Sequence, residues 1–123
     1  MKLRVVFSAL LLAAGGAVAP ALAQELPPRV ARGQALFEYW CAPCHGPGIG
    51  NNGAPYLPGE GALRAKYKGA LPALLQERTD MTPEFVKHYV REGITIMPFF
   101  RKTEVSDADL DAIAAYLTRA RKP

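Results

Sequence analysis

The amino-acid sequence predicts an all-α domain of three to four helices joined by long loops. Apolar residues recur at helical spacing in several segments of the 123-residue chain, and no useful length of it alternates between apolar and polar residues as a half-buried strand does. Residues 46–61 contain six glycines and three prolines, a composition that sustains neither a helix nor a strand. A domain so rich in loops is short of hydrophobic core, so we expect something other than side chains to fill its centre.

The first 23 residues have the pattern of a secretory signal peptide. Lys2 and Arg4 precede an apolar run, and the small residues at 21–23 offer a cleavage site. Glycines and a proline interrupt the run, which disfavours an uncleaved anchor of roughly 20 continuous apolar residues. We therefore expect a signal peptide over residues 1–23 and one domain over residues 24–123. The mature protein should be periplasmic, without stable membrane insertion.

The charge balance argues against a nucleic-acid partner. The whole chain has a formal net charge of +4, and Lys2 and Arg4 leave with the signal peptide. The remaining charge of +2 is too small to form the basic patch that nucleic-acid binding needs.

The mature chain begins with a predicted helix from Pro28 to Cys44. Its apolar residues recur at helical spacing, and Gly33 lies on the same stripe. A glycine at that place indicates that another backbone crosses the helix there. The helix gives way to residues 46–61, which we expect to form an extended loop.

Further helices are predicted after this loop. A short one covers residues 71–78, and the basic run at residues 64–68 before it is expected to be a solvated face. The next spans residues 82–93, and the last begins at Ser106 with Asp109 as its capping partner. The apolar face of this last helix contains Leu110, Ile113, Ala114 and Leu117.

The most specific motif in the chain is Cys41-Ala-Pro-Cys44-His45, which has the Cys-X-X-Cys-His spacing of c-type haem attachment. Residues at i, i+3 and i+4 of a helix lie on one side. Two thiols placed in this way can form thioethers with the haem vinyl groups while the imidazole reaches the iron. We therefore predict one haem c, bound covalently through Cys41 and Cys44, with His45 as an iron ligand.

Three rival interpretations of these cysteines fit the sequence less well. Residues 40–44 also resemble the Trp-Cys-X-Pro-Cys of thioredoxin-like proteins, and Met97-Pro98 could imitate their cis-proline. A thioredoxin nucleophile opens a long helix after a buried strand, whereas here a helical pattern precedes Cys41, so this interpretation is disfavoured. A zinc site lacks ligands, because His88 is the only other histidine and no third cysteine exists. The adjacent His45 disfavours a purely structural disulfide.

A haem iron held by His45 needs a second ligand or an open position. A second protein ligand favours electron transfer, whereas an open position would favour gas binding or peroxide chemistry. We predict Met97 as this ligand, because it lies in an apolar loop before a rigid proline. Met81 has polar neighbours and is expected to have a packing role. His88 lies opposite the apolar stripe of its helix and is expected to be exposed.

With these motifs the chain resembles a small class I cytochrome c over residues 29–121. Gly33 and Phe37 precede Cys41 as in the N-terminal helix of that family. Residues 114–117 resemble its C-terminal helix, which crosses over that glycine. The resemblance implies a fold wrapped around one covalently bound haem.

A further segment, Ala54-Pro55-Tyr56-Leu57, resembles the Gly-Pro-X-Leu of that family, with Ala54 in place of the glycine. In the family the proline carbonyl accepts the Nδ1 proton of the iron-bound histidine. The resemblance therefore implies that Pro55 and Leu57 belong to the haem-binding residues. It also implies that His45 and Met97 are the two iron ligands.

Residues 71–118 resemble more closely the cytochrome subunit of 4-cresol dehydrogenase (hydroxylating), also called p-cresol methylhydroxylase. The resemblance rests on runs such as Leu-Pro-Ala-Leu-Leu at 71–75 and Ile-Met-Pro-Phe-Phe at 96–100. In that family a flavoprotein (FAD) subunit oxidises a 4-alkylphenol and passes electrons to the bound cytochrome. The resemblance implies a non-enzymatic subunit that accepts electrons one at a time and passes them to a downstream redox protein. The alternative is a free periplasmic carrier that serves another dehydrogenase or a terminal oxidase.

Overall fold

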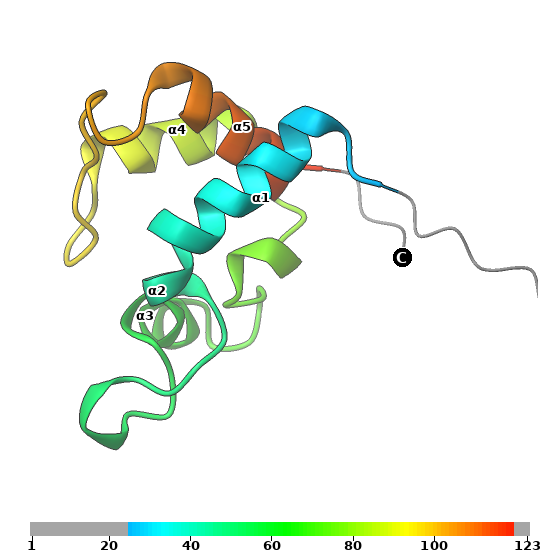
Figure 1. Cartoon of the computed structure of the whole chain (residues 1–123). Helices are drawn as coiled ribbons and strands as arrows, with labels where there is room; N and C mark the ends of the chain where they lie inside the picture. The colour runs from blue at the N-terminus through cyan, green and yellow to red at the C-terminus, as the bar shows by residue number, and fades with distance from the viewer. Residues whose placement is uncertain (1–24, 120–123) are drawn as a thin grey trace, which may run out of the picture.

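The computed structural model describes residues 25–119, and its regular structure is helical (Figure 1). The five α-helices are α1 (Pro28–Trp40), α2 (Ala42–His45), α3 (Pro58–Tyr67), α4 (Pro83–Glu92) and α5 (Asp107–Leu117). Two 3₁₀ turns, Asn51–Gly53 and Leu75–Glu77, lie in the connections. Residues 25–119 contain no strand and only one isolated bridge, between Ile94 and Met97. The predicted all-α class is confirmed, with five helices rather than three to four.

The predicted signal peptide, residues 1–23, lies outside the described residues. From residue 25 to residue 119, no helix is long and apolar enough to cross a membrane. Cleavage of the leader and export of the chain therefore stay predictions.

Helices α1 and α5 pack against each other (Figure 1). They cross at Gly33, as the sequence predicts. A Cβ atom added at Gly33 would lie 1.9 Å from the carbonyl oxygen of Ala112, so only a residue without a side chain permits this approach. One helical turn further along α1, the rings of Phe37 and Tyr116 pack with their centroids 5.6 Å apart. The crossing therefore combines a backbone contact with an aromatic one.

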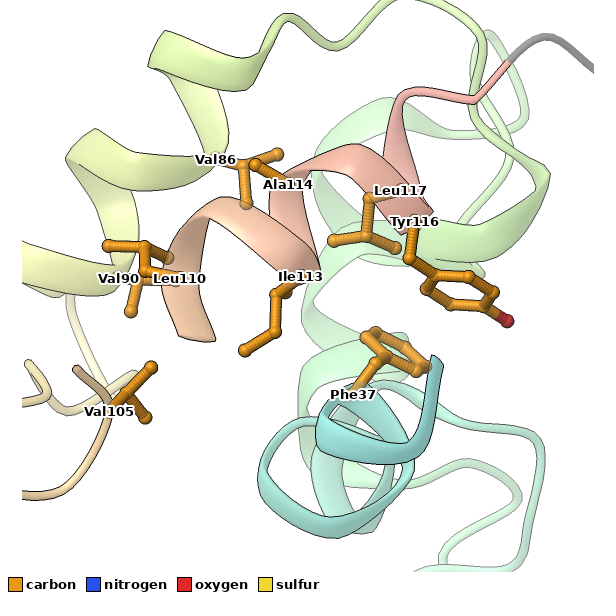
Figure 2. Packing of buried hydrophobic residues seen from close by; sticks show 9 residues of the cluster. All are labelled: Phe37, Val86, Val90, Val105, Leu110, Ile113, Ala114, Tyr116 and Leu117. Atoms are coloured by element: carbon orange, nitrogen blue, oxygen red, sulfur yellow. The ribbon is translucent and has the colours of Figure 1, made fainter. Parts of the chain in front are cut away.

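The hydrophobic core lies between α1, α4 and α5, with one residue from the segment before α5 (Figure 2). Tyr116 of α5 lies beside Phe37 of α1, and Ala114 lies beside Val86 of α4. The buried residues, here called the core cluster, are Phe37, Val86, Val90, Val105, Leu110, Ile113, Ala114, Tyr116 and Leu117. No residue of α3 belongs to this cluster, so the core occupies one half of the described molecule.

Helices α4 and α5 begin where the sequence predicts. The hydroxyl oxygen of Thr82 accepts a hydrogen bond from the Phe85 N–H at 3.2 Å, and that of Ser106 accepts one from the Asp109 N–H at 3.1 Å. Each bond satisfies a backbone donor that the first turn of a helix leaves free. At the other end of α4, Gly93 stops the helix with a φ of 67°.

The segment between α2 and α4 differs from the prediction. The glycine- and proline-rich loop stops at Leu57, because Pro58 begins α3, a helix that the sequence analysis missed. Proline suits the first position of a helix, where its missing N–H is not needed. Lys68 then ends α3 in the left-handed conformation. The helix predicted over residues 71–78 was wrong, since only the 3₁₀ turn Leu75–Glu77 forms there.

A buried arginine keeps the end of that segment out of a helical conformation. The Arg78 side chain is only 3% exposed, and its Nε and Nη2 donate to the two Asp80 carboxylate oxygens at 2.9 and 2.5 Å. Its guanidinium also lies over the ring of Tyr67, 4.7 Å from the centroid. A buried charge must be paired, and these contacts hold the backbone at Arg78 extended, with φ −75° and ψ 141°.

We expect Gly33→Ala to destabilise the fold by about 2 kcal/mol or more, because the added methyl group must push α1 and α5 apart. Gly61→Ala is the matched control, since a Cβ there would lie 3.8 Å from the Tyr56 Cβ, an ordinary contact. Thermal unfolding followed by circular dichroism would measure both variants. Equal unfolding midpoints for the two would contradict the close crossing.

Candidate haem site

The predicted attachment segment interrupts the first helix at Cys41. The sequence predicts one helix over residues 28–44, but Cys41 has φ −111° and caps α1, and α2 follows as a separate turn. The N–H groups of Cys44 and His45 both donate to the Cys41 carbonyl, at 3.1 and 2.8 Å. These bonds keep the two thiols and the imidazole within one helical turn, which is the spacing that haem attachment requires.

Both cysteines are free thiols, but their surroundings differ. Cys44 is exposed, whereas Cys41 is half-buried against the core cluster. Burial is the main cause that raises the pKa of Cys41 to about 12, and the neighbouring Cys44 thiol adds to the rise. The Cys41 thiol therefore stays protonated at neutral pH, whereas a thioredoxin nucleophile has a lowered pKa. The peptide bond before Pro98 is also trans, which further opposes the thioredoxin-like interpretation.

His45 packs against the first turn of α3. A Cβ atom at Gly59 would lie 2.7 Å from both Nδ1 and Cε1 of the imidazole and 2.8 Å from the Cys44 carbonyl oxygen. Helix α3 can therefore approach the ring only through a glycine. Nδ1 is buried and has no hydrogen-bond partner among the described residues, and burial lowers the pKa of His45. The ring is neutral at neutral pH, which is the form that ligates a metal.

The segment around Pro55 does not make the contact that the resemblance implies. Pro55 is exposed, and its carbonyl accepts no hydrogen bond from His45, whose Nδ1 has no partner within residues 25–119. The Gly50 N–H donates to the Ala54 carbonyl at 2.8 Å and closes a turn immediately before Pro55. Leu57 is half-buried at the start of α3. A contact of Pro55 or Leu57 with haem stays a prediction.

Met97 lies in residues 93–100, here called the Met97 loop, which extends from the end of α4 (Figure 1). The N–H groups of Ile94 and Met97 each donate to the other's carbonyl, at 3.1 and 2.8 Å, so the loop folds into a tight turn. Gly93 permits this turn, because a Cβ there would lie 2.7 Å from the Met97 carbonyl oxygen. Met97 is half-buried against the core cluster, as Cys41 is. The predicted ligand and an attachment cysteine therefore reach the same core.

The two other candidate ligands lie as the sequence predicts. His88 is exposed, and its ring lies beside that of Tyr89 with the centroids 5.1 Å apart. Met81 is half-buried against the core cluster, in agreement with a packing role. Because Met81 and Met97 contact the same cluster, variants of both residues are needed to identify the ligand.

The sequence analysis missed two features around the site. The edge of the Trp40 ring meets Phe100, with centroids 5.9 Å apart and planes at 77°, and this contact joins the end of α1 to the Met97 loop. The second is the contact of Gly59 with His45. In the sequence, only the proline directly before that glycine indicates that a helix begins there.

The residue after Gly59, Glu60, is only 3% exposed. It forms an ion pair with Arg64, one turn further along α3, at 2.8 Å.

These residues fit a covalently bound haem c. Two free thiols and a neutral imidazole share one turn, as thioether attachment and iron ligation require. Met97 offers a soft sulfur ligand from a second element that packs against the same core cluster. Helix α3 adds no residue to that cluster, so a large apolar group would supply the core that this half of the described chain lacks.

We expect Gly59→Ala to disturb ligation by His45, because the new methyl group would overlap the imidazole ring. Gly61→Ala adds the same group to the same helix without a close contact. Paramagnetic NMR of the ferric haem-loaded protein should show displaced ligand resonances and a larger high-spin fraction for Gly59→Ala, and wild-type spectra for Gly61→Ala. Wild-type spectra for both variants would show that Gly59 does not position the ring.

One family model, described as cytochrome c oxidase, cbb3-type, subunit III, matches residues 28–117 of this chain. The match runs from the first residue of α1 to the last residue of α5 and so includes the whole fold described above. Comparisons with curated proteins and with solved structures gave no match. Together with the Cys41–His45 turn, the family match shows that the chain belongs to this family of c-type cytochromes.

Proposed function

We propose that this chain is an exported electron carrier that accepts electrons one at a time from a flavoprotein dehydrogenase and passes them to a downstream redox protein. The observation that carries the proposal is the Cys41–His45 turn, with its two free thiols and neutral imidazole. Haem bound there supplies a one-electron couple between Fe(II) and Fe(III). The family match supports electron transfer rather than catalysis.

In this proposal His45 and Met97 remain the two iron ligands in both the reduced and the oxidised state. Gly59 packs against the His45 ring, and two backbone hydrogen bonds with Ile94 shape the turn that carries Met97. Two fixed ligands leave no open position, which argues against a peroxidase or a gas sensor. A methionine ligand in apolar surroundings also favours the reduced state and keeps the reduction potential high.

We expect Met97→Ala to abolish the weak near-infrared band of methionine-ligated ferric haem and to lower the midpoint potential. Met81→Ala is the matched control, because it removes the same kind of thioether side chain, which also packs against the core cluster. The band should persist in Met81→Ala and in His88→Ala. A band that survives in Met97→Ala would assign the ligand to another residue.

The electron donor that we propose is a flavoprotein (FAD) that oxidises a 4-alkylphenol. The support is the resemblance of residues 71–118 to the cytochrome subunit of 4-cresol dehydrogenase. The Met97 loop offers apolar side chains for docking, since Ile96 is 71% exposed and Phe99 is 60% exposed. The two basic residues after the loop are each paired with a carboxylate. This surface therefore has a weak electrostatic field, which favours short-range apolar contact over long-range steering.

We expect Phe99→Asp to weaken binding to that flavoprotein by about tenfold or more, because it places a charge in an apolar contact. Lys66→Glu alters an exposed charge on α3 and should have little effect. Phe100 is unsuitable for this test, since it is half-buried against Trp40 and the core cluster. Titration calorimetry at low and high salt would measure the affinities. Equal effects of the two variants, or a steep dependence on salt, would contradict apolar docking.

The alternative is a free periplasmic carrier that serves another dehydrogenase or a terminal oxidase. The description of the matched family, which names a subunit of a cbb3-type cytochrome c oxidase, favours the oxidase as its partner. Co-purification from the native host separates the two proposals. A stable complex with a flavoprotein supports the dehydrogenase subunit, whereas a monomer that exchanges electrons by collision supports the free carrier.

A further inference from the structure

The last residue of the Met97 loop, Phe100, is fastened to the last turn of α4 by two hydrogen bonds. The Phe100 N–H donates to the Val90 carbonyl at 2.8 Å, and the Phe100 carbonyl accepts a hydrogen bond from Nη1 of Arg91 at 2.9 Å. Phe100 thus returns to the place where the chain left the helix. We propose that Arg91 is a positioning residue that holds the Met97 loop closed and thereby holds Met97 at the iron.

The second arm of the Arg91 guanidinium reaches the start of α5. Its Nη2 donates to Oδ1 of Asp107, the first residue of that helix, at 2.9 Å. The Arg91 side chain is only 21% exposed, whereas that of Asp107 is 64% exposed. The Arg91 side chain therefore joins α4, the end of the Met97 loop and α5. Its hydrogen bond to the loop is better shielded from solvent than its ion pair with Asp107.

The loop has few other attachments of this strength. The side chains of Ile94, Ile96 and Phe99 are exposed, and the bonds between Ile94 and Met97 stay within the loop itself. Its other anchors are the Phe100 N–H bond, the contact of Phe100 with Trp40, and the packing of Met97 and Phe100 against the core cluster. A hydrogen bond from a charged donor contributes more than one between neutral groups. Arg91 therefore sets how readily the loop opens and releases Met97.

Lys102 provides a matched control for Arg91. Its Nζ also donates to the Asp107 carboxylate, at 2.8 Å, but the bond to the Phe100 carbonyl comes from Arg91. Arg91→Gln and Lys102→Gln each remove one positive charge beside Asp107. The difference between these two variants therefore isolates the bond to the loop.

The test uses the haem-loaded full chain in the ferric state, titrated with imidazole, which displaces a methionine ligand from the iron. We expect Arg91→Gln to bind imidazole about tenfold more tightly than wild type, because opening the loop breaks one charged hydrogen bond fewer. Lys102→Gln should remain within about twofold of wild type. Equal affinities of Arg91→Gln and Lys102→Gln would overturn the proposal.

The inference rests on the proposed ligation by Met97, so a second readout tests the loop itself. Amide hydrogen exchange at Phe100 should be about tenfold faster in Arg91→Gln than in Lys102→Gln. If wild type lacks the near-infrared band, the ligand assignment fails, and this exchange rate still decides whether Arg91 holds the loop. Should Arg91→Gln not yield folded protein, Arg91→Met takes its place. Methionine keeps an unbranched apolar stem but donates no hydrogen bond to the Phe100 carbonyl, so the exchange should change in the same direction, and an unchanged rate would refute the role of Arg91.

Discussion

At the crossing of α1 and α5, a methyl group on Gly33 would overlap the carbonyl oxygen of Ala112. This contact sets how closely the two helices approach, and the core cluster extends from it toward α4. Because Cys41 directly follows α1, the crossing also fixes where the attachment turn begins. The Met97 loop leaves from α4, the other helix packed on α5, and joins α1 again through Phe100 and Trp40. The α1–α5 pair thus positions the attachment turn directly and the Met97 loop through α4.

The half of the molecule around α3 is built on a different principle. Helix α3 contributes no residue to the core cluster. This half instead contains two charged side chains, Glu60 and Arg78, that are each only 3% exposed. Both are paired, with Arg64 and with Asp80, which is the condition under which a protein tolerates buried charge. Paired charges shape a chain, but apolar burial supplies most of the folding free energy. This imbalance is the physical reason to expect a prosthetic group beside α3.

Most features that the sequence predicted correctly depend on local chemistry. The starts of α4 and α5 follow from the hydroxyl groups of Thr82 and Ser106, which accept from N–H groups three residues away. The spacing of Cys41, Cys44 and His45 likewise needs only one turn of helix. Apart from the crossing at Gly33, the features that depend on distant contacts were missed. The sequence around Gly59 is rich in helix-breaking residues, and only the tertiary contact with His45 explains the glycine. Arg91 gives no local sign that it reaches Phe100. In place of the helix predicted over residues 71–78, a 3₁₀ turn precedes the buried, ion-paired Arg78.

Covalent haem at the Cys41–His45 turn can be detected by mass spectrometry of the protein purified from its native host, after acid denaturation and treatment with a thiol-alkylating reagent. We expect one haem to stay on the chain and to map to the peptide containing Cys41 and Cys44, with neither cysteine alkylated. A haem-free chain in which both cysteines are alkylated, or are joined in a disulfide, would contradict it.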